Sequence, residues 1–416
     1  FGSSGRQPMG AGTSVESAPS ESGSLEEAGA DFGERASEEA SPRLTSLAPP
    51  ALFGQHVSHF APDDMLGDAE IEAFASKYAL DDSARAELKK MFTGVVSGTR
   101  RRVTVRVPAT TANMGPGFDC AGMALDIWNE VTVERAAVFS FEIEGEGAGV
   151  LPRTSGNLVC KGVEAAFKAI GKEVPVLRYW TRNRIPFAKG MGSSSAAIVS
   201  GILAGLAIAG FNLQVKGEEE LLQIATNIEG HPDNVAPCIY GGFQLGIHNG
   251  TRWWTDRVSM PHGLMCVVFA PDHATETSAA RDLLKAQVDV KDAVFNCGRV
   301  GLLVAAFATN NLEWLRLATE DALHQPQRAP MHTHLNPLIR AALDAGAHGA
   351  CLSGAGPAVI AFTGGRAGDV IAQNHAERKE LEVAEAFLAA ADAINCPGQV
   401  IITKPIEHGG YIVSET

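Results

Sequence analysis

The sequence has no long apolar run and carries fewer basic than acidic residues. Its 416 residues include 34 Lys and Arg against 48 Asp and Glu, a formal net charge of −14. Nucleic acids and anionic membranes are polyanions, so this charge disfavours both as main partners. No stretch approaches the roughly 18 apolar residues that a membrane span needs. We therefore expect neither nucleic acid nor membrane as a partner, although a few local Arg or Lys residues would suffice for a small anionic ligand.

The cysteines lack any close pairing. There are seven, an odd number, scattered along the chain without a C-x-x-C pair. This pattern disfavours a disulfide framework or a zinc site built on cysteines and favours a reducing compartment. The expected location is the cytoplasm, with an organelle left open because the sequence begins at Phe1 rather than at Met.

The first hundred residues differ in composition from the rest. Residues 1–60 are dominated by Gly, Ser, Ala, Pro and Glu, with almost no branched apolar residues. Such a segment buries too little surface to offset its ordering entropy, which predicts a disordered low-complexity extension. Helical spacing over 68–92, with Asp82 as a candidate N-cap, predicts a helical extension over 61–99.

A deletion tests the first of these predictions. Removal of residues 1–60 should leave the melting temperature and kcat nearly unchanged, because the segment has no core-forming composition. A loss of several degrees in a thermal unfolding experiment would instead show that the segment docks on the fold.

From Arg102 onward, alternating and apolar segments predict strands mixed with helices. We expect an α+β chain whose two halves, 100–260 and 261–416, form separate domains. One helix is expected to close at the segment "EGHPDNVAP" (229–237), and a long helix is expected over 278–308. A glycine-rich turn is expected within 108–131, between two strands.

The segment "KGMGSSSAAIVSGILAG" (189–205) places glycines and serines directly before an apolar helix. A helix N-terminus leaves N–H groups unpaired and carries a partial positive charge, while glycine lets the backbone approach a ligand. This favours a phosphate-binding turn; the alternative is an ordinary loop with a serine N-cap. A hydrolase built on Ser194, His231 and Asp233 is disfavoured, because only Pro232 separates the last two.

Two further glycine-rich segments carry polar groups. "PATTANMGPGFDCAGMALDIWNEV" (108–131) contains Asn113 and Asp119 and suits a small polar ligand, with a long structural loop as the alternative. "GAHGACLSGAGPAVIAF" (346–362) is predicted to form a strand, a glycine turn and a strand, whose backbone N–H groups could form a second anion-binding nest.

Together these motifs resemble those of the GHMP small-molecule kinases, in the family's order across residues 102–416. "EGHPDNVAP" narrows the resemblance to the homoserine kinases. The resemblance implies an α+β, two-domain GHMP kinase fold, with a ribosomal-S5-like N-terminal domain, a ferredoxin-like C-terminal domain and the active site between them. It also implies ATP-dependent phosphorylation of the side-chain hydroxyl of L-homoserine to O-phospho-L-homoserine, in threonine biosynthesis.

The same resemblance implies roles for individual residues. The ATP-binding set would be Pro186, Lys189, Gly190, Met191, Gly192, Ser193, Ser194, Ser195 and Ala196. The homoserine-binding set would be Asn113, Asp119, His231, Asn234, Thr277, Arg281 and Arg328. In this set Asp119 would take the ammonium, and the two arginines would take the carboxylate, for which guanidinium groups are well shaped.

The resemblance also implies that Mg²⁺, which prefers hard oxygen ligands, is held by Glu229 and one of Ser193–Ser195, with Ser194 as the named candidate. Ser194, Glu229 and Asn234 form the implied catalytic set, in which Asn234 orients the acceptor hydroxyl. No strong general base is expected, since positioning and charge carry most of phosphoryl transfer; Asp233 is the competing candidate.

Two other functions stay open, and a homodimer is the expected assembly. One is a GHMP-type kinase acting on mevalonate or a sugar, which would not need both Asp119 and the two arginines. The other is a non-catalytic metabolite-binding relative, which an altered serine loop or Glu229 would favour; both are intact.

Overall fold

The computed structural model describes residue 76 and residues 100–211, 219–275, 277–364 and 378–416. The extension predicted over 1–60 lies outside the described residues, as does nearly all of 61–99. Among the helices that the structure does describe, none combines the length and apolar character needed to cross a bilayer.

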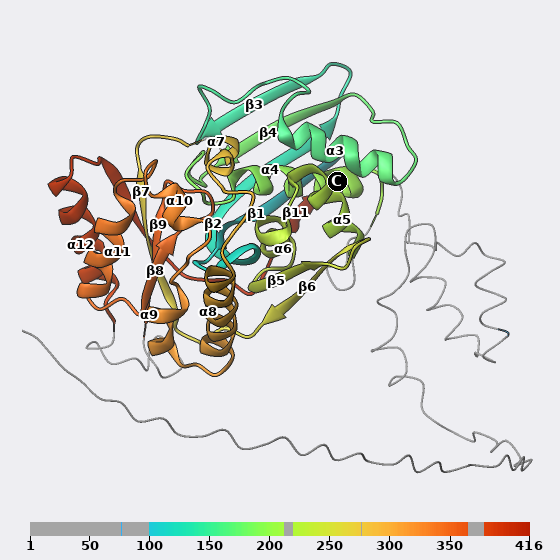
Figure 1. The fold of residues 1–416 in the computed structure, drawn as a ribbon. Helices are drawn as coiled ribbons and strands as arrows, with labels where there is room; N and C mark the ends of the chain where they lie inside the picture. Colours follow the sequence, from blue (N-terminus) through green and yellow to red (C-terminus); the bar gives the residue numbers. More distant parts are fainter. Residues whose placement is uncertain (1–75, 77–99, 212–218, 276, 365–377) are drawn as a thin grey trace, which may run out of the picture. The chain divides into compact units, whose positions relative to one another are not determined.

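A seven-stranded sheet forms the first layer of the fold (Figure 1). Five strands run in the order β11-β1-β2-β4-β3, and β5 and β6 extend it from the start of β2. All pairs are antiparallel except β3 with β4. The strands are β1 (Arg102–Asn113), β2 (Gly117–Arg135), β3 (Ser140–Gly145), β4 (Leu177–Asn183), β5 (Phe243–His248), β6 (Trp253–Val258) and β11 (Tyr411–Glu415).

Four helices pack on this sheet. α4 and α6 contact β1 and β2 directly, α3 packs against α4, and α5 packs against α4 and α6 and contacts β6. Asn157 caps α3 by accepting a hydrogen bond from the Val159 amide, which is a local signal for the start of this helix. α4 is apolar on nearly all sides, which fits its position as an almost completely buried helix. The bounds are α3 (Leu158–Ala169), α4 (Ser193–Ile208), α5 (Glu219–Glu229) and α6 (Pro232–Tyr240).

The glycine-rich turn predicted within 108–131 is much shorter in the structure. β1 continues to Asn113 and β2 begins at Gly117, so only three residues lie between the paired strands. Both faces of this hairpin are largely covered, which removes the polar–apolar alternation by which a strand is recognised.

The "EGHPDNVAP" segment closes a helix as predicted, and it also begins a second helix that was not predicted. α5 ends at Glu229, and Pro232 occupies the first turn of a new helix, α6, after His231 in extended conformation. Proline is well tolerated at this position, since its missing N–H would be unpaired there in any case.

A second, four-stranded sheet follows residue 264. Its strands run in the order β10-β7-β9-β8, all antiparallel, in a β-α-β-β-α-β chain order. This is the ferredoxin-like arrangement that the sequence predicts for the second half. The strands are β7 (Met265–Pro271), β8 (Gly349–Leu352), β9 (Val359–Thr363) and β10 (Gly398–Thr403).

The long helix predicted over 278–308 is broken in the structure. Between α7 and α8 the Lys285 amide donates to the Gln327 side chain instead of to a helical carbonyl, and Asp289 starts α8 in extended conformation. Figure 1 shows α11 and α12 on the side of the second sheet away from α8. The helices of this half are α7 (Thr277–Asp282), α8 (Val290–Ala308), the 3₁₀ helix η3 (Leu312–Trp314), α9 (Leu315–Ala318), α10 (Gln325–Arg328), α11 (Leu335–Asp344) and α12 (Glu380–Ala393).

The two sheets share one hydrophobic core. Phe307 of α8 packs edge-on against Phe243 of β5, with ring centroids 5.1 Å apart, and against Phe362 of β9 at 6.2 Å. The chain then returns to its beginning, because β11 pairs with β1 at the edge of the first sheet. The predicted second domain, 261–416, thus contributes its last strand to the first sheet.

Candidate active site

A cleft of about 450 Å³ collects side chains from both halves of the chain. Most of the residues singled out in the sequence line it: Asn113, Asp119, Gly190, Gly192, Ser193, Ser194, Glu229, His231, Asn234, Thr277, Arg281 and Arg328. Five residues of the predicted ATP-binding set are not part of the lining: Pro186, Lys189, Met191, Ser195 and Ala196. Met191, Ser195 and Ala196 are buried beneath it.

The first amides of α4 face this cleft without a side-chain cap. Gly192 is the N-cap residue, in the left-handed conformation with φ 69°, and within the part of the chain that the structure describes no side chain caps the helix there. A Cβ on Gly192 would lie 1.9 Å from Thr110 Oγ1, so glycine is required both for the turn and for the close approach. An uncapped helix N-terminus exposed in a cleft is suited to an anion.

The glycine turn at 353–357 supports this loop instead of forming a second anion nest. The amides of Ser353, Gly354 and Gly356 donate to carbonyls of the protein, at 2.9, 3.0 and 2.9 Å. The Ser353 hydroxyl lies 2.7 Å from Gly190 O, to which it donates. The nest predicted from the sequence is therefore wrong for these three amides.

A carboxylate and two hydroxyls meet beside the start of α4. Ser194 Oγ and Ser195 Oγ donate to Glu229 Oε1, at 2.8 and 2.7 Å. Ser194 lines the cleft whereas Ser195 is fully buried. The oxygens of Ser194 and Glu229 are therefore the pair accessible to a cation, and hard oxygen donors are what Mg²⁺ prefers.

At another part of the cleft, Arg281 and Asp119 form a bidentate ion pair. The two guanidinium nitrogens donate to the two carboxylate oxygens at 2.9 and 2.8 Å. The hydrogen bond to Asp119 raises the pKa of Arg281 further. Both side chains are partly exposed, at 43% and 31%, so the pair is accessible from the cleft.

Arg328 is held differently. It is 1% exposed, and its guanidinium donates to the backbone oxygens of Ala280 and Gly354. Both guanidinium groups contact the Phe118 ring, that of Arg281 at 5.5 Å from its centroid and that of Arg328 at 5.4 Å. The aromatic face offsets part of the repulsion between two cations in one cleft.

Asn113 and Asn234 are oriented by the protein itself. Asn113 accepts from the Asp119 amide and donates to Gly354 O, so it fixes the turn that presents Asp119. Asn234 Oδ1 accepts from Thr110 Oγ1 at 2.7 Å, which leaves its side-chain N–H groups as the part that can donate to a ligand.

His231 is paired with Asp233, which is 2% exposed. Burial alone would lower the pKa of His231, but the hydrogen bond and charge of Asp233, with the charges of Glu229 and Asp119, raise it to about 9. Ser194 donates to Glu229 and His231 contacts Asp233, so these bonds do not form the serine–histidine–aspartate relay of a hydrolase.

The raised pKa predicts a pH-dependent stability. Protonated His231 should stabilise the fold fully below its unfolded pKa of 6.5, and this contribution should be lost as pH rises through about 9. The difference in unfolding free energy between wild type and His231→Gln, from urea titrations, should therefore be largest at pH 6 and shrink by pH 9.5. A difference independent of pH would contradict the assigned charge.

Lys189 is directed away from the glycine–serine turn. Its ammonium donates to the backbone oxygens of Asp272 and His273, which follow β7. The Thr275 amide in turn donates to Ala188 O, so two contacts join these segments.

Comparison with known proteins agrees with this geometry. Family models of the GHMP kinases match residues 157–242 (N-terminal domain) and 303–386 (C-terminal). The chain is 44% identical over 309 residues to a homoserine kinase of Moorella thermoacetica, an alignment that covers 74% of this chain and 99% of the relative. A homoserine kinase of Desulfitobacterium hafniense is 39% identical, with 70% and 98% covered. The chain belongs to the homoserine kinase family.

A solved structure agrees with this family. The crystal structure of a homoserine kinase from Cytophaga hutchinsonii superposes with a TM-score of 0.67 at 28% identity, covering 76% of this chain and 99% of that one. The GHMP kinase fold predicted from the sequence is thereby confirmed, and membership of a kinase family carries ATP use with it.

Three residues that support the site were not identified from the sequence. Thr110 orients Asn234, and Phe118 contacts both arginines. Buried Asp321 accepts from the His324 and Gln325 amides at the start of α10, the helix that ends at Arg328. Thr110 contacts Asn234 from 124 positions away, so no local pattern reveals its role. Phe118 adjoins Asp119, and Asp321 accepts from amides three and four positions ahead, so both of these offered a local signal.

Proposed function

We propose that this protein transfers the γ-phosphoryl group of ATP to the side-chain hydroxyl of L-homoserine. The observation that carries the proposal is the Asp119–Arg281 pair, which displays a carboxylate and a guanidinium side by side in the cleft that receives the α4 N-terminus. An amino acid carries the complementary charges on one carbon. The names of the relatives at 44% and 39% identity support the same substrate.

The charged pair would exchange partners when the substrate binds. The α-carboxylate takes the place of Asp119 on Arg281, with Arg328 as a second, fixed donor, and the ammonium takes the place of Arg281 on Asp119. Exchange leaves no charge unpaired, whereas a ligand with only one of the two charges leaves a protein group unmatched.

The phosphates would occupy the turn at Gly190–Ser194, on the uncapped amides of α4. Glu229 and Ser194 would hold Mg²⁺, which when bound neutralises charge on the transferring phosphoryl group. The arrangement fits this ion because the two oxygens lie within 2.8 Å of each other and Ser194 reaches the cleft.

Asn234 would position the acceptor hydroxyl without taking its proton. An amide is no base near neutral pH, and Oδ1 of Asn234 is already engaged by Thr110. Asp233, the competing candidate, is occupied by His231. Positioning and charge neutralisation then account for catalysis, as the loose transition state of phosphoryl transfer allows.

A substrate comparison tests the proposal. ATP turnover is measured with L-homoserine, L-serine, L-threonine, mevalonate and galactose, and kcat/KM should be highest for L-homoserine. A higher value for mevalonate or galactose would assign the cleft to another GHMP-type substrate. Absence of turnover with all five, together with retained ligand binding, would favour a non-catalytic metabolite-binding protein.

A further inference from the structure

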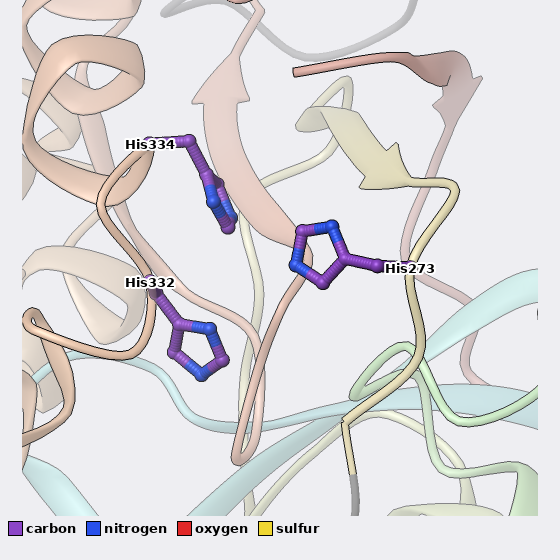
Figure 2. Close-up of side chains that lie close together, drawn as sticks. All are labelled: His273, His332 and His334. Carbon is purple, nitrogen blue, oxygen red and sulfur yellow. The ribbon is translucent and has the colours of Figure 1, made fainter. Parts of the chain in front are cut away.

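Three histidines converge beside the glycine turn at 353–357, outside the cleft described above (Figure 2). His332 and His334 lie in the connection between α10 and α11, and His273 follows β7. One ring nitrogen of each lies within 4.8 Å of the others. The ring centroid of His334 is 5.5 Å from that of His273 and 5.8 Å from that of His332.

Two of these rings have a fixed tautomer. Nε2 of His332 lies 2.9 Å from Ala355 O, and Nε2 of His334 lies 2.8 Å from Pro357 O. A carbonyl only accepts, so both Nε2 atoms carry the proton and both Nδ1 atoms carry a lone pair. Metal-binding histidines are commonly oriented in this way, with the second nitrogen donating to a carbonyl.

One of the two lone pairs is buried and unsatisfied. His332 is 1% exposed, and its Nδ1 has no hydrogen-bond partner among the described residues. In Figure 2 the three rings surround a common space, with His332 and His273 on opposite sides of it and His334 above. A buried acceptor without a partner is costly, which is a reason to look for the ligand that it binds.

All three rings favour the neutral form that a metal needs. Burial lowers the pKa of His332 to about 4, and burial also lowers the pKa of His334. For His273, partial burial and then the charge of Lys189 lower the pKa.

We propose that His273, His332 and His334 bind a first-row transition-metal dication, with Zn²⁺ as the best-matched ion. Neutral imidazoles suit zinc, and three protein ligands leave a fourth tetrahedral position for water. Two nitrogens on one tetrahedral zinc lie about 3.4 Å apart, given Zn–N distances of about 2.0–2.1 Å. The rings must therefore close slightly, and exposed His273 is the one free to move.

Zinc at this position would tie together the three segments around the glycine turns. His332 contacts the 353–357 turn through Ala355, and the backbone of His273 accepts from Lys189 of the glycine–serine turn. Binding should therefore raise the melting temperature.

Calorimetric titration of the full chain with Zn²⁺, after removal of metals by a chelator and without ATP, tests the site. We expect one site per chain and, with Co²⁺ as a probe, the intense visible absorption of a four-coordinate ion. His273→Ala should raise the Kd for Zn²⁺ tenfold or more and abolish the zinc-dependent rise in melting temperature. His273 is exposed, so this variant should fold. His262→Ala removes another exposed histidine and should behave as wild type.

Three results would overturn the proposal. The first is a wild type that binds no Zn²⁺, and the second is a His273→Ala variant that binds as tightly as wild type. The third is binding that survives His273→Ala but is lost in Asp119→Asn, because Asp119, His231 and Asp233 form a second possible cluster inside the cleft. Zinc binding is measured without nucleotide or acceptor, so its outcome is independent of the substrate comparison.

Discussion

Arg281→Leu should raise the KM for L-homoserine roughly thirtyfold or more, while the KM for ATP barely moves. Removal of one partner from a charge-assisted pair costs about 2–5 kcal/mol when the other is left unpaired, and 1.4 kcal/mol corresponds to tenfold. The structure adds a second cause, because Asp119 loses its counter-ion and would then repel the substrate carboxylate. Some loss of kcat should follow, since remote binding energy also orients the reacting group.

The comparison that isolates the carboxylate uses 3-aminopropan-1-ol, which is homoserine without that group. Wild type should strongly prefer homoserine, and Arg281→Leu should lose most of this preference. Arg299→Leu is the matched control, because Arg299 is also a partly exposed arginine paired with an acid, Glu320, but does not line the cleft. Full discrimination in Arg281→Leu, or a loss of ATP binding instead, would show that Arg281 is not the carboxylate ligand.

Gly192→Val should raise the KM for ATP at least tenfold or abolish turnover. Its Cβ would overlap Thr110 Oγ1 and lie 3.2 Å from Asn234 Oδ1, so the change disturbs both the helix N-terminus and the residue proposed to orient the acceptor. The left-handed backbone adds about 1–3 kcal/mol of strain for a residue other than glycine. Steady-state kinetics with ATP varied at saturating homoserine measures the effect.

Gly171→Val is the control that separates the effect of left-handed backbone strain from the effect of disturbing the nucleotide site. Gly171 has φ 64°, close to the 69° of Gly192, but a Cβ there meets no atom within 4 Å. This control should lose stability with little change in KM for ATP. If a folded Gly192→Val variant had the same kinetic constants as wild type, the turn would not be part of the nucleotide site.

Local motifs predicted the site better than they predicted its internal connections. Gly192, Ser194 and Glu229 were recognisable because residue type and order carry the signal, and the structure brings them to one cleft. Their roles, and those of the other site residues, remain predictions. The Asp119–Arg281 pair spans 162 positions in the chain, and no local pattern encodes that these two charges will pair.

Secondary structure shows the same division between local and distant causes. The apolar helix predicted directly after the glycine–serine turn is present as α4, because the glycine before it and its apolar residues are local features. The hairpin at 113–117 and the break before α8 did not match. Burial on both faces hides the first, and a side chain 42 positions away, Gln327, takes the amide that would have continued the second.

The aromatic contacts of Phe307 have a consequence for protein engineering. From the sequence alone, residue 260 would look like a boundary at which the two halves of the chain could be exchanged. A fragment ending there would expose Phe243 to solvent, because the fragment lacks Phe307. It would also lack β11, so the edge of β1 would be open to pairing with other chains. A viable chimera therefore has to carry α8 and the C-terminal strand along with the first sheet, so the exchangeable unit is discontinuous in sequence.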